Sequence, residues 1–229
     1  MKLSIIIPAH NEEKRISRTF ASIHHIFEGD FEVIVVSNGS TDNTANVLEE
    51  AKKKYPYIIF MDFKEKLGKG GAILEGLKIA QGEIIGFLDA DDAFDLEQVK
   101  VAIDNFSEEY DCFIASKWKN QKLFEIAEPF SRKIMSRGWN FLVKIILGLN
   151  FRDTQGGLKF LKRSAFEKIG NSFIGTGFEF DAELLWKLQK NHFKIKEIHI
   201  PNRFVQGSTF NTKYIPAMFL NMLKLRWLK

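Results

Sequence analysis

The chain has 229 residues, 45% of them hydrophobic and 27% charged, with a formal net charge of +4, a balance that is ordinary for a globular protein. Its single cysteine excludes an internal disulfide framework and a cysteine-based zinc site. No uncharged apolar run approaches the ~18 residues that a membrane-spanning helix needs, and the start, MKLSIIIPAHNEE, becomes polar too early for a signal peptide.

Five short apolar runs rich in β-branched residues lie in the first half of the chain and predict strands buried on both faces. They cover residues 3–7, 32–36, 57–61, 83–88 and 112–116. Helical patterns separate them, near residues 12–27, 41–54, 69–81 and 95–109. This alternation predicts an α/β fold with a mostly parallel sheet flanked by helices, in which ligands bind beyond the carboxyl ends of the strands.

The second half of the chain is less regular. A long helical pattern runs from Glu128 to Leu149, and a Gly-rich turn, DTQGGLKFLKR, a helix near residues 180–190 and a strand, FKIKEIHI, follow it. Pro216 begins a last helix whose apolar residues cover most of its circumference. This pattern is equally compatible with packing on the core and with lying among lipid headgroups.

The loop after the first predicted strand reads Pro8-Ala-His-Asn-Glu12. It contains no glycine, which excludes a dinucleotide-binding fingerprint and a P-loop at this position. Asn11 is placed to cap the helix that follows. We expect His10 and Glu12 to face a base or ribose.

The loop after the second predicted strand has the sequence of a tight turn, and the loop after the third has residues suited to binding phosphate. The segment SNGSTD, residues 37–42, contains an Asn-Gly turn, and Ser40 or Thr41 can cap the next helix. The segment LGKGGA, residues 67–72, places glycines and Lys69 at a helix N-terminus, a position suited to phosphate or diphosphate.

Three acidic residues follow the fourth predicted strand in the stretch GFLDADDAF. In extended backbone Asp89 and Asp91 project to the same side, and carboxylates that close repel each other unless a cation lies between them. A hard cation such as Mg²⁺, with diphosphate oxygens completing its shell, is the simplest solution. The alternative is a solvent-facing turn in which Asp92 or Asp95 caps the next helix.

Taken as a set, these segments resemble the family-2 glycosyltransferases of GT-A fold. The resemblance rests on IIIPAHNEE, VIVVSNGSTDNT, KLGKGGAILEGLKIAQGEII and FLDADDAF. The segments FRDTQGGLKFLKR and GFEFDAELL, followed by IHIP and QGST, narrow it to the dolichyl-phosphate (polyprenyl-phosphate) hexosyltransferases. GKGGA with RDTQ is most similar to the glucosyl branch.

The resemblance implies one GT-A domain over residues 1–229, with a nucleotide-sugar half (1–116), an acceptor half (117–212) and a C-terminal helix (213–229). It implies inverting transfer of a hexose from a nucleotide sugar to a polyprenyl or dolichyl phosphate, with UDP-glucose favoured as donor and mannose from GDP-mannose as the alternative. The cofactor would be Mg²⁺ or Mn²⁺, and no nucleic-acid partner is expected. We expect a peripheral protein at the cytoplasmic face of a membrane.

The family roles transfer to matching positions of this sequence. Asp89 and Asp91 would hold the metal, Asp91 being counted among the catalytic residues with Asp153 and Gln155 at the reacting centre. The nucleotide and donor phosphates would contact Pro8, His10, Glu12, Ser37, Asn38, Gly39 and Lys69. The acceptor phosphate would contact Lys117, Arg132 and Arg203.

Three positions depart from the family pattern. Ser37-Asn38 replaces the Asp-Asp pair that relatives often carry, which leaves the identity of the base open. Ala93 cannot supply the further metal ligand of some mannosyl relatives. Lys117 stands where relatives often carry arginine, so a bidentate phosphate contact becomes a point charge.

The implied reaction is a single in-line displacement by a phosphate oxygen. Because a phosphate is already ionised at pH 7, Asp153 would orient the acceptor rather than deprotonate it, and an ion pair with Arg152 is the structural alternative. The acidic residues Glu179, Asp181 and Glu183 are a weaker source of a base.

The distribution of charge agrees with this interpretation. Residues 1–111 contain 12 basic and 21 acidic side chains, whereas residues 112–229 contain 21 and 8. The acidic half would bind metal and nucleotide, and the basic half would face lipid phosphate and an anionic leaflet. Four aromatic residues are candidates for interfacial contact, with core packing as the alternative: Trp118, Trp139, Phe141 and Trp227.

Three other functions are compatible with part of the pattern. A family-2 transferase with a soluble or polymer acceptor is the nearest. A sugar nucleotidyltransferase would share the sheet but would need a Gly-rich first loop. A non-catalytic binding module would need no metal and would tolerate the loss of both Asp89 and Asp91.

Overall fold

The computed structural model describes residues 2–106, 109–121, 129–203 and 212–227. The strands are β1 (Leu3–Ala9), β2 (Phe31–Asn38), β3 (Ile58–Phe63), β4 (Ile84–Leu88), β5 (Cys112–Ala115), β6 (Leu158–Lys162) and β7 (Ile195–Ile198). The helices are α1 (Ile16–Ile26), α2 (Thr44–Lys54), α3 (Lys69–Ile79), α4 (Leu96–Asp104), α5 (Phe130–Leu147), α6 (Arg163–Ile169), α7 (Phe180–Lys190) and α8 (Ile215–Trp227), with a 3-10 turn at Thr212–Tyr214. Every strand and helix that the sequence predicts is present, with shifted ends.

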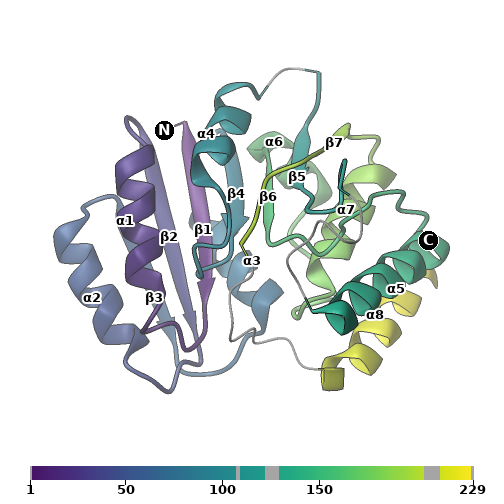
Figure 1. Cartoon of the computed structure of the whole chain (residues 1–229), viewed down its shortest axis with the longest axis horizontal. Helices are drawn as coiled ribbons and strands as arrows, with labels where there is room; N and C mark the ends of the chain where they lie inside the picture. Colours follow the sequence, from purple (N-terminus) through teal and green to yellow (C-terminus); the bar gives the residue numbers. More distant parts are fainter. Residues whose placement is uncertain (1, 107–108, 122–128, 204–211, 228–229) are drawn as a thin grey trace.

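These strands form one sheet in the order β3-β2-β1-β4-β6-β5-β7 (Figure 1). β1 pairs in parallel with β2 and β4, β2 with β3, and β5 with β7. Only β6 runs the other way among the described strands, antiparallel to β4 and β5. The predicted mostly parallel α/β architecture is therefore confirmed, and the carboxyl ends of the parallel strands meet at one edge.

The segment DTQGGLKFLKR, predicted as a Gly-rich turn, is a turn only in its first half. Its second half forms β6, in which Leu158, Lys159 and Phe160 are fully buried. The two lysines in this short run conceal its strand character in the sequence. Because β6 is antiparallel, the residues that precede it reach the edge at which the parallel strands end.

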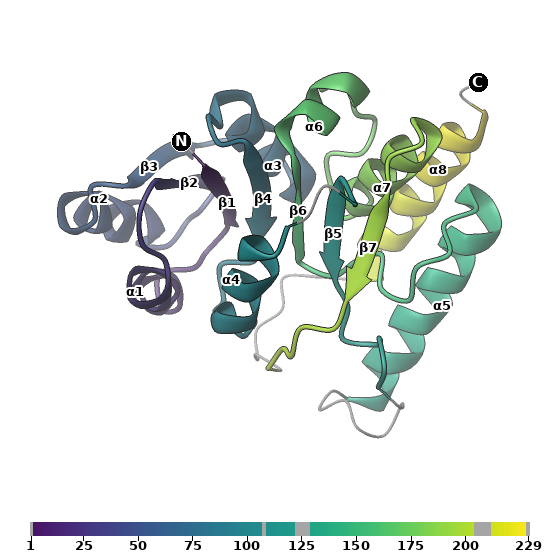
Figure 2. The ribbon, with the colours of Figure 1, turned by 90° about the horizontal axis from the view of Figure 1, so that it is seen from above.

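Apolar layers cover both faces of the sheet. The side chains of α1, α2 and α4 form one layer with residues such as Phe20, Leu48 and Val99. The other layer lies under α3 and α5–α8 and includes Ile73 and Leu184. Figure 2 shows the sheet between α1 and α4 on one side and α3, α6 and α7 on the other.

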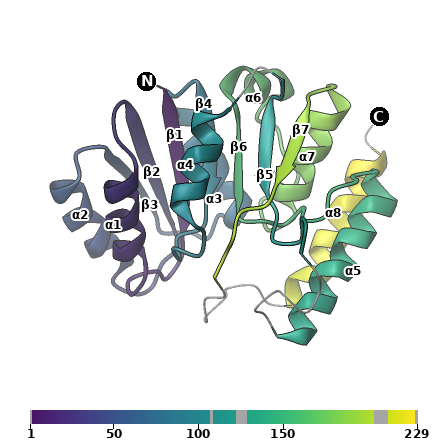
Figure 3. The same cartoon turned by 45° about the horizontal axis from the view of Figure 1, so that its top comes forward.

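Helix α8 packs along α5 at one end of the molecule, as Figures 1 and 3 show. Its side chains Met218, Met222 and Leu225 are buried. Of the two alternatives for this helix, core packing is thus realised on its inward face, whereas Leu220 and Trp227 remain exposed. Within the described ranges, no helix combines the length and the apolar character needed to cross a bilayer.

The four aromatic candidates for interfacial contact separate into two pairs. Trp118 and Trp139 are buried, and Trp118 Nε1 donates a hydrogen bond to Ser136 Oγ at 3.2 Å. The prediction of interfacial contact is wrong for these two, because their rings fill space inside the fold. Phe141 and Trp227 are 63% and 82% exposed.

Candidate active site

A cavity of about 840 Å³ lies at the edge where the parallel strands end. Its walls come from the loops after β1, β2, β3, β4, β5 and β7, from the loop before β6, and from α5 and α8. Twelve of the predicted site residues line it, and they are Pro8, His10, Glu12, Asn38, Lys69, Asp89, Asp91, Lys117, Arg132, Asp153, Gln155 and Arg203. Residues spread over most of the chain are thus brought into one space.

Ser37 and Gly39 lie outside this lining, in contrast to the expectation that they contact the nucleotide. Ser37 is fully buried, and its hydroxyl is 3.4 Å from Ser40 Oγ. Gly39 adopts a φ of 63° and donates its N–H to a carbonyl of β3. Both residues shape the turn that presents Asn38, whose Oδ1 accepts a hydrogen bond from Leu67 N at 2.5 Å.

Asp89 and Asp91 lie on the cavity wall directly after β4. Asp89 Oδ1 is 2.9 Å from Lys69 Nζ, and Asp91 Oδ1 accepts a hydrogen bond from Ala93 N at 3.2 Å. Burial, followed by the negative charge of Asp89, raises the pKa of the Asp91 carboxyl. The mutual repulsion expected from the sequence is present, and the Lys69 ammonium offsets part of it.

The residues around this pair fit a hard divalent cation. Mg²⁺ prefers oxygen ligands and is commonly held by one or two carboxylates together with substrate phosphates. Among the residues that the structure describes, no group of three or more acidic, His or Cys side chains forms a closed metal site. A β-carbon on Gly157 would overlap Asp89 Oδ2, so this glycine leaves the space that the carboxylate occupies. Mg²⁺ or Mn²⁺ bound here would take its other ligands from substrate and water.

The capping alternative for the same stretch is realised by Asp95. Its Oδ1 accepts a hydrogen bond from Gln98 N at 3.2 Å at the start of α4. Asp92 has a φ of 55° and forms an ion pair with Arg18 at 2.9 Å, outside the cavity lining. The acidic side chains of one short stretch therefore divide between the cavity, α1 and the cap of α4.

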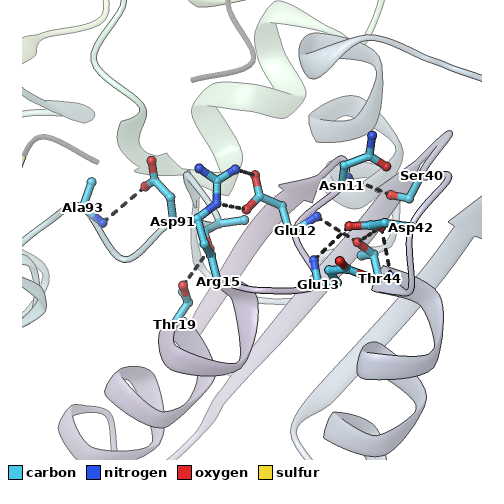
Figure 4. A network of polar contacts seen from close by, with 11 residues as sticks. Asn11, Glu12, Glu13, Arg15, Thr19, Ser40, Asp42, Thr44, Asp91 and Ala93 are labelled. Carbon is cyan, nitrogen blue, oxygen red and sulfur yellow. Dashed lines mark hydrogen bonds and ion pairs between the residues drawn. The ribbon is translucent and has the colours of Figure 1, made fainter. Parts of the chain in front are cut away.

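Glu12 and Arg15 form a two-bond ion pair on the cavity wall, and Figure 4 shows it beside Asp91. Arg15 Nε is 2.7 Å from Glu12 Oε2, and a terminal nitrogen is 2.8 Å from Oε1. Burial raises the pKa of the Glu12 carboxyl, and Arg15 opposes this change. His10 lies nearby, with Nδ1 2.8 Å from Asn38 O.

The predicted caps of α1 and α2 differ from those observed. Asn11 does not cap α1; it has a φ of 57°, and its Oδ1 accepts a hydrogen bond from Thr41 N at 2.8 Å. Asp42, rather than Ser40 or Thr41, accepts from Thr44 N at 3.0 Å at the start of α2 (Figure 4). Asn11 thus joins the loop after β1 to the loop after β2, whereas Asp42, in the loop after β2, bonds to the first residue of α2.

The Gly-rich segment before α3 presents a side chain to the cavity rather than its first amides. Gly70 N and Gly71 N donate to Gly177 O at 3.1 Å and to Thr176 O at 2.9 Å. A β-carbon on Gly70 would overlap Phe180, so glycine permits the close approach of α3 to α7. The phosphate-binding candidate of this segment is therefore Lys69 alone.

Asp153 is buried next to the cavity, where its Oδ2 accepts a hydrogen bond from Lys117 N at 3.3 Å. Glu197 Oε1 accepts from the backbone amides of Arg152 and Asp153, both at 2.9 Å. Burial raises the pKa of Asp153 to about 6, although Lys117 and Lys159 oppose this change. No ion pair joins Asp153 to Arg152 in the described part of the chain, so that alternative is not realised.

Asp153→Asn should change how stability depends on pH. Because the pKa is raised to about 6 from 3.8, the folded protein binds this proton more tightly than the unfolded chain does between those values. Wild-type stability should therefore gain from this group as the pH falls through that interval, and the variant should lack the gain. Urea unfolding across the interval and at neutral pH measures it. A wild-type-minus-variant difference that stays constant with pH would contradict the burial of an ionisable Asp153.

The acidic residues Glu179, Asp181 and Glu183 have three different environments. Glu179 lines the cavity, and its Oε1 accepts a hydrogen bond from Asn221 Nδ2 at 2.9 Å. Glu183 accepts backbone hydrogen bonds from Ile174 and Gly175 and so holds the loop before α7. Asp181 is buried and paired with a lysine. Only Glu179 among these three faces the cavity.

The sequence patterns missed Lys159, which is fully buried in β6. Its Nζ donates to Gly156 O at 2.8 Å and pairs with Asp181. A lysine at the centre of an apolar run is the signal that marks it, since a buried charge requires a partner. Phe94 and Asn202, joined by an isolated bridge, also line the cavity, and no local pattern marks either.

The chain is similar to several glycosyltransferases, and residues 4–170 match the model of the family described as glycosyl transferase family 2. The dolichyl-phosphate beta-glucosyltransferase of Drosophila melanogaster is 30% identical over 224 residues, covering 91% of this chain and 69% of the relative. The UDP-N-acetylglucosamine–dolichyl-phosphate N-acetylglucosaminyltransferase of Methanococcus voltae is 28% identical, covering 98% and 95%. Glycosyltransferase AglD of Haloferax volcanii is 28% identical over 87% of this chain, which spans 33% of the length of that relative.

A solved structure shares the fold over the full length of the chain. Glucosyl-3-phosphoglycerate synthase from Mycobacterium tuberculosis, in complex with Mn²⁺, uridine diphosphate and phosphoglyceric acid, matches with a TM-score of 0.71. The match covers 100% of this chain and 79% of the other, at 18% sequence identity. At that identity the likeness shows the arrangement of the sheet and helices.

Proposed function

Because the chain belongs to glycosyl transferase family 2 and has the GT-A fold of its structural neighbours, we propose that it transfers a hexose from a nucleotide sugar to a polyprenyl or dolichyl phosphate. UDP-glucose is the favoured donor, since the Drosophila melanogaster relative is named a dolichyl-phosphate beta-glucosyltransferase. The chain as a whole, residues 1–229, acts as one domain in this proposal, with the donor bound mainly by residues 1–116 and the acceptor by residues 117–212.

One observation carries the proposal: a single cavity is lined both by a carboxylate pair and by a set of cations. Asp89 and Asp91 suit a metal-bound diphosphate. Lys117, Arg132 and Arg203 suit a second phosphate, which in this proposal belongs to the acceptor.

On the donor side, Asp89 and Asp91 would hold the divalent cation, which when bound would neutralise negative charge on the diphosphate. Lys69 offers an ammonium group beside Asp89 and so is placed for the same oxygens. His10 and Asn38 line the part of the cavity formed after β1 and β2, where the nucleoside would lie.

On the acceptor side, the cations orient a phosphate that is already ionised at neutral pH. One phosphate oxygen attacks the anomeric carbon, and the nucleoside diphosphate leaves with the electrons of the broken bond. Asp153, fixed by Lys117 N and by Glu197 through the backbone, would orient the acceptor, with Gln155 beside it. Buried Gln155 Nε2 has no hydrogen-bond partner among the described residues, which supports its role as a donor to substrate.

The outer surface of α5 supports a lipid-linked acceptor. Its exposed residues Phe130, Ile134, Phe141 and Ile145 are spaced by four, seven and four positions and form one stripe, the α5 stripe. Met135 and Leu142, at neighbouring positions of the same helix, line the cavity. We propose that the α5 stripe contacts the membrane surface that carries the acceptor, and that the exposed side chain of Trp227 on α8 also contacts it.

Replacing both Phe141 and Ile145 by serine should reduce binding to anionic phospholipid vesicles by about tenfold or more, because each buried large apolar side chain contributes about 1.5–3 kcal/mol. Vesicle co-sedimentation measures the partition. Val101→Ser is the matched control, since Val101 is 59% exposed on α4. Equal vesicle binding by the double variant and the control would refute the role of the α5 stripe.

Transfer of radiolabelled sugar into an organic-extractable lipid tests the function directly. UDP-glucose, UDP-N-acetylglucosamine and GDP-mannose are offered separately with polyprenyl phosphate and Mg²⁺, with and without chelator. The expected result is chelator-sensitive label in lipid from UDP-glucose. Metal-dependent donor hydrolysis without lipid label would retain the transferase and reject the lipid acceptor.

N-acetylglucosamine is the second candidate sugar. The Methanococcus voltae relative that carries it in its name matches over nearly the full length of both chains, whereas the Drosophila melanogaster relative is longer than this chain. Label in lipid from UDP-N-acetylglucosamine alone would select this alternative.

A further inference from the structure

A fully buried ion pair lies beneath the cavity, between Lys159 of β6 and Asp181 of α7. The two side chains are 0% and 1% exposed. Lys159 Nζ also donates to Gly156 O at 2.8 Å, in the loop that carries Asp153. The pair therefore links the sheet, α7 and the acceptor-side loop of the cavity.

The second oxygen of Asp181 lies near Lys69, and it is Lys69 that lines the cavity. Asp181 Oδ2 is buried and has no hydrogen-bond partner among the described residues, but it lies 3.8 Å from Lys69 Nζ. Lys69 Nζ is in turn 2.9 Å from Asp89 Oδ1. The charges thus alternate from Lys159 through Asp181 and Lys69 to Asp89.

This arrangement strongly favours the charged form of Lys69. Burial lowers the pKa of the amine, but Asp89 and then Asp181 more than compensate, so the pKa is raised. The ammonium group faces two carboxylates of different exposure, 37% for Asp89 and 1% for Asp181. Asp89 is partly exposed on the cavity wall, whereas Asp181 is fixed inside the fold by Lys159.

Stability alone does not explain why such a pair is present. Apolar residues of similar volume often replace a buried ion pair without loss of stability, because removing two charges from water costs about as much as their attraction returns. An anion that is fixed in the core and directed at a cavity-lining lysine has a separate use: it holds the cation in place when other ligands compete for Asp89.

We propose that Asp181, held by Lys159, is a positioning residue that keeps the Lys69 ammonium at the donor-diphosphate end of the cavity. The inference rests on the proposed function, in which Asp89 binds a divalent cation and can no longer serve as the main partner of Lys69. Asp181 then retains Lys69 beside the diphosphate oxygens. Asp181 acts through Lys69 and does not touch substrate.

A double-mutant cycle on nucleotide affinity tests this role. UDP binding in the presence of Mn²⁺ is measured by calorimetry for wild type, Lys69→Met, Asp181→Asn and the double variant. A hydrogen bond to a charged group contributes about 1.5–3 kcal/mol, so each single change should weaken binding by roughly tenfold or more. Since Asp181 acts through Lys69, the double variant should bind no more weakly than Lys69→Met. A double variant whose loss equals the product of the two single losses would overturn the proposal.

Glu183→Gln is the matched control for a general disturbance of α7. Glu183 is buried on the same helix and holds the loop before it, but it lies outside the cavity lining. Its effect should combine multiplicatively with that of Lys69→Met, as expected for sites without a shared partner. If it instead showed the same non-additivity as Asp181→Asn, the coupling would be a property of α7 and the specific role of Asp181 would be rejected.

Asp181→Asn leaves Lys159 buried without its anion, so a second variant replaces the whole pair. Lys159→Met with Asp181→Leu removes both charges and should fold. In this background Lys69→Met should weaken UDP binding by a smaller factor than it does in wild type, and an equal factor in the two backgrounds would overturn the proposal. Wild-type protein that binds neither UDP nor GDP with Mn²⁺ would reject the proposed donor class and this inference with it. Tight wild-type binding with additive variants would reject the positioning role alone.

Discussion

Asp91→Asn should reduce metal-dependent sugar transfer by about 10²- to 10³-fold, with the fold retained. The change removes one carboxylate of the Asp89–Asp91 pair on the cavity wall, and an amide oxygen does not supply the charge that a divalent cation requires. The loss is comparable with that seen when one preorganised electrostatic contact to a transition state is removed. Asp89→Asn should have a similar effect, and the lipid-transfer assay with titrated Mg²⁺ or Mn²⁺ measures both.

Asp92→Asn is the control for these two variants. Asp92 is adjacent in sequence and also acidic, but it pairs with Arg18 and lies outside the cavity lining. Its φ of 55° is one that asparagine adopts readily. We expect transfer to remain close to wild type. If Asp92→Asn and Asp91→Asn lowered transfer equally, a general loss of negative charge after β4 would explain the data and the metal site would be rejected.

Lys159→Met should lower the free energy of unfolding by about 3–5 kcal/mol, because it leaves the Asp181 carboxylate buried without its main counter-charge. Urea unfolding at neutral pH measures the change. The effect should be among the largest of any single lysine substitution in this chain, since most lysines are exposed and exposed ion pairs contribute little.

Lys162→Met, in the same strand, is the matched comparison. Lys162 pairs with Asp111 at 3.3 Å, but the two side chains are 29% and 25% exposed. Solvent screening limits such a pair to about 0–1 kcal/mol. Equal destabilisation by the two methionine variants would show that Lys159 is not paired in the core as described.

The family relationship decides between the alternative functions at the level of the enzyme class. The match over residues 4–170 identifies a glycosyltransferase and excludes the reading as a non-catalytic module of another family. The structure adds the reason that the sequence pattern works: the loops carrying His10, Asn38 and Asp89 meet because their strands are parallel neighbours. The transfer experiment identifies the sugar and tests the lipid acceptor.

Features that depend on short-range periodicity could be predicted from the amino-acid sequence alone. The buried strands of the first half and the helices between them follow from apolar spacing. A cap of α4 at Asp92 or Asp95 was also an alternative from the sequence, and the structure selects Asp95. The pair Asp89 and Asp91 was proposed from its spacing on an extended backbone. The structure instead has a turn at Ala90 and Asp91, directly after β4, and both carboxylates nevertheless line the cavity.

The partners of residues that are distant in the chain could not be predicted in this way, because they depend on how the elements pack. Gly70 and Gly71 donate to carbonyls more than a hundred residues away, so their amides are taken by the loop before α7. The run LKFLK forms an antiparallel strand between β4 and β5 and pairs with both of them. Lys159 contacts Asp181 because α7 packs on that strand. Local patterns fix backbone preference and the side of each residue, whereas the pairing of buried charges depends on which elements the packed core brings together.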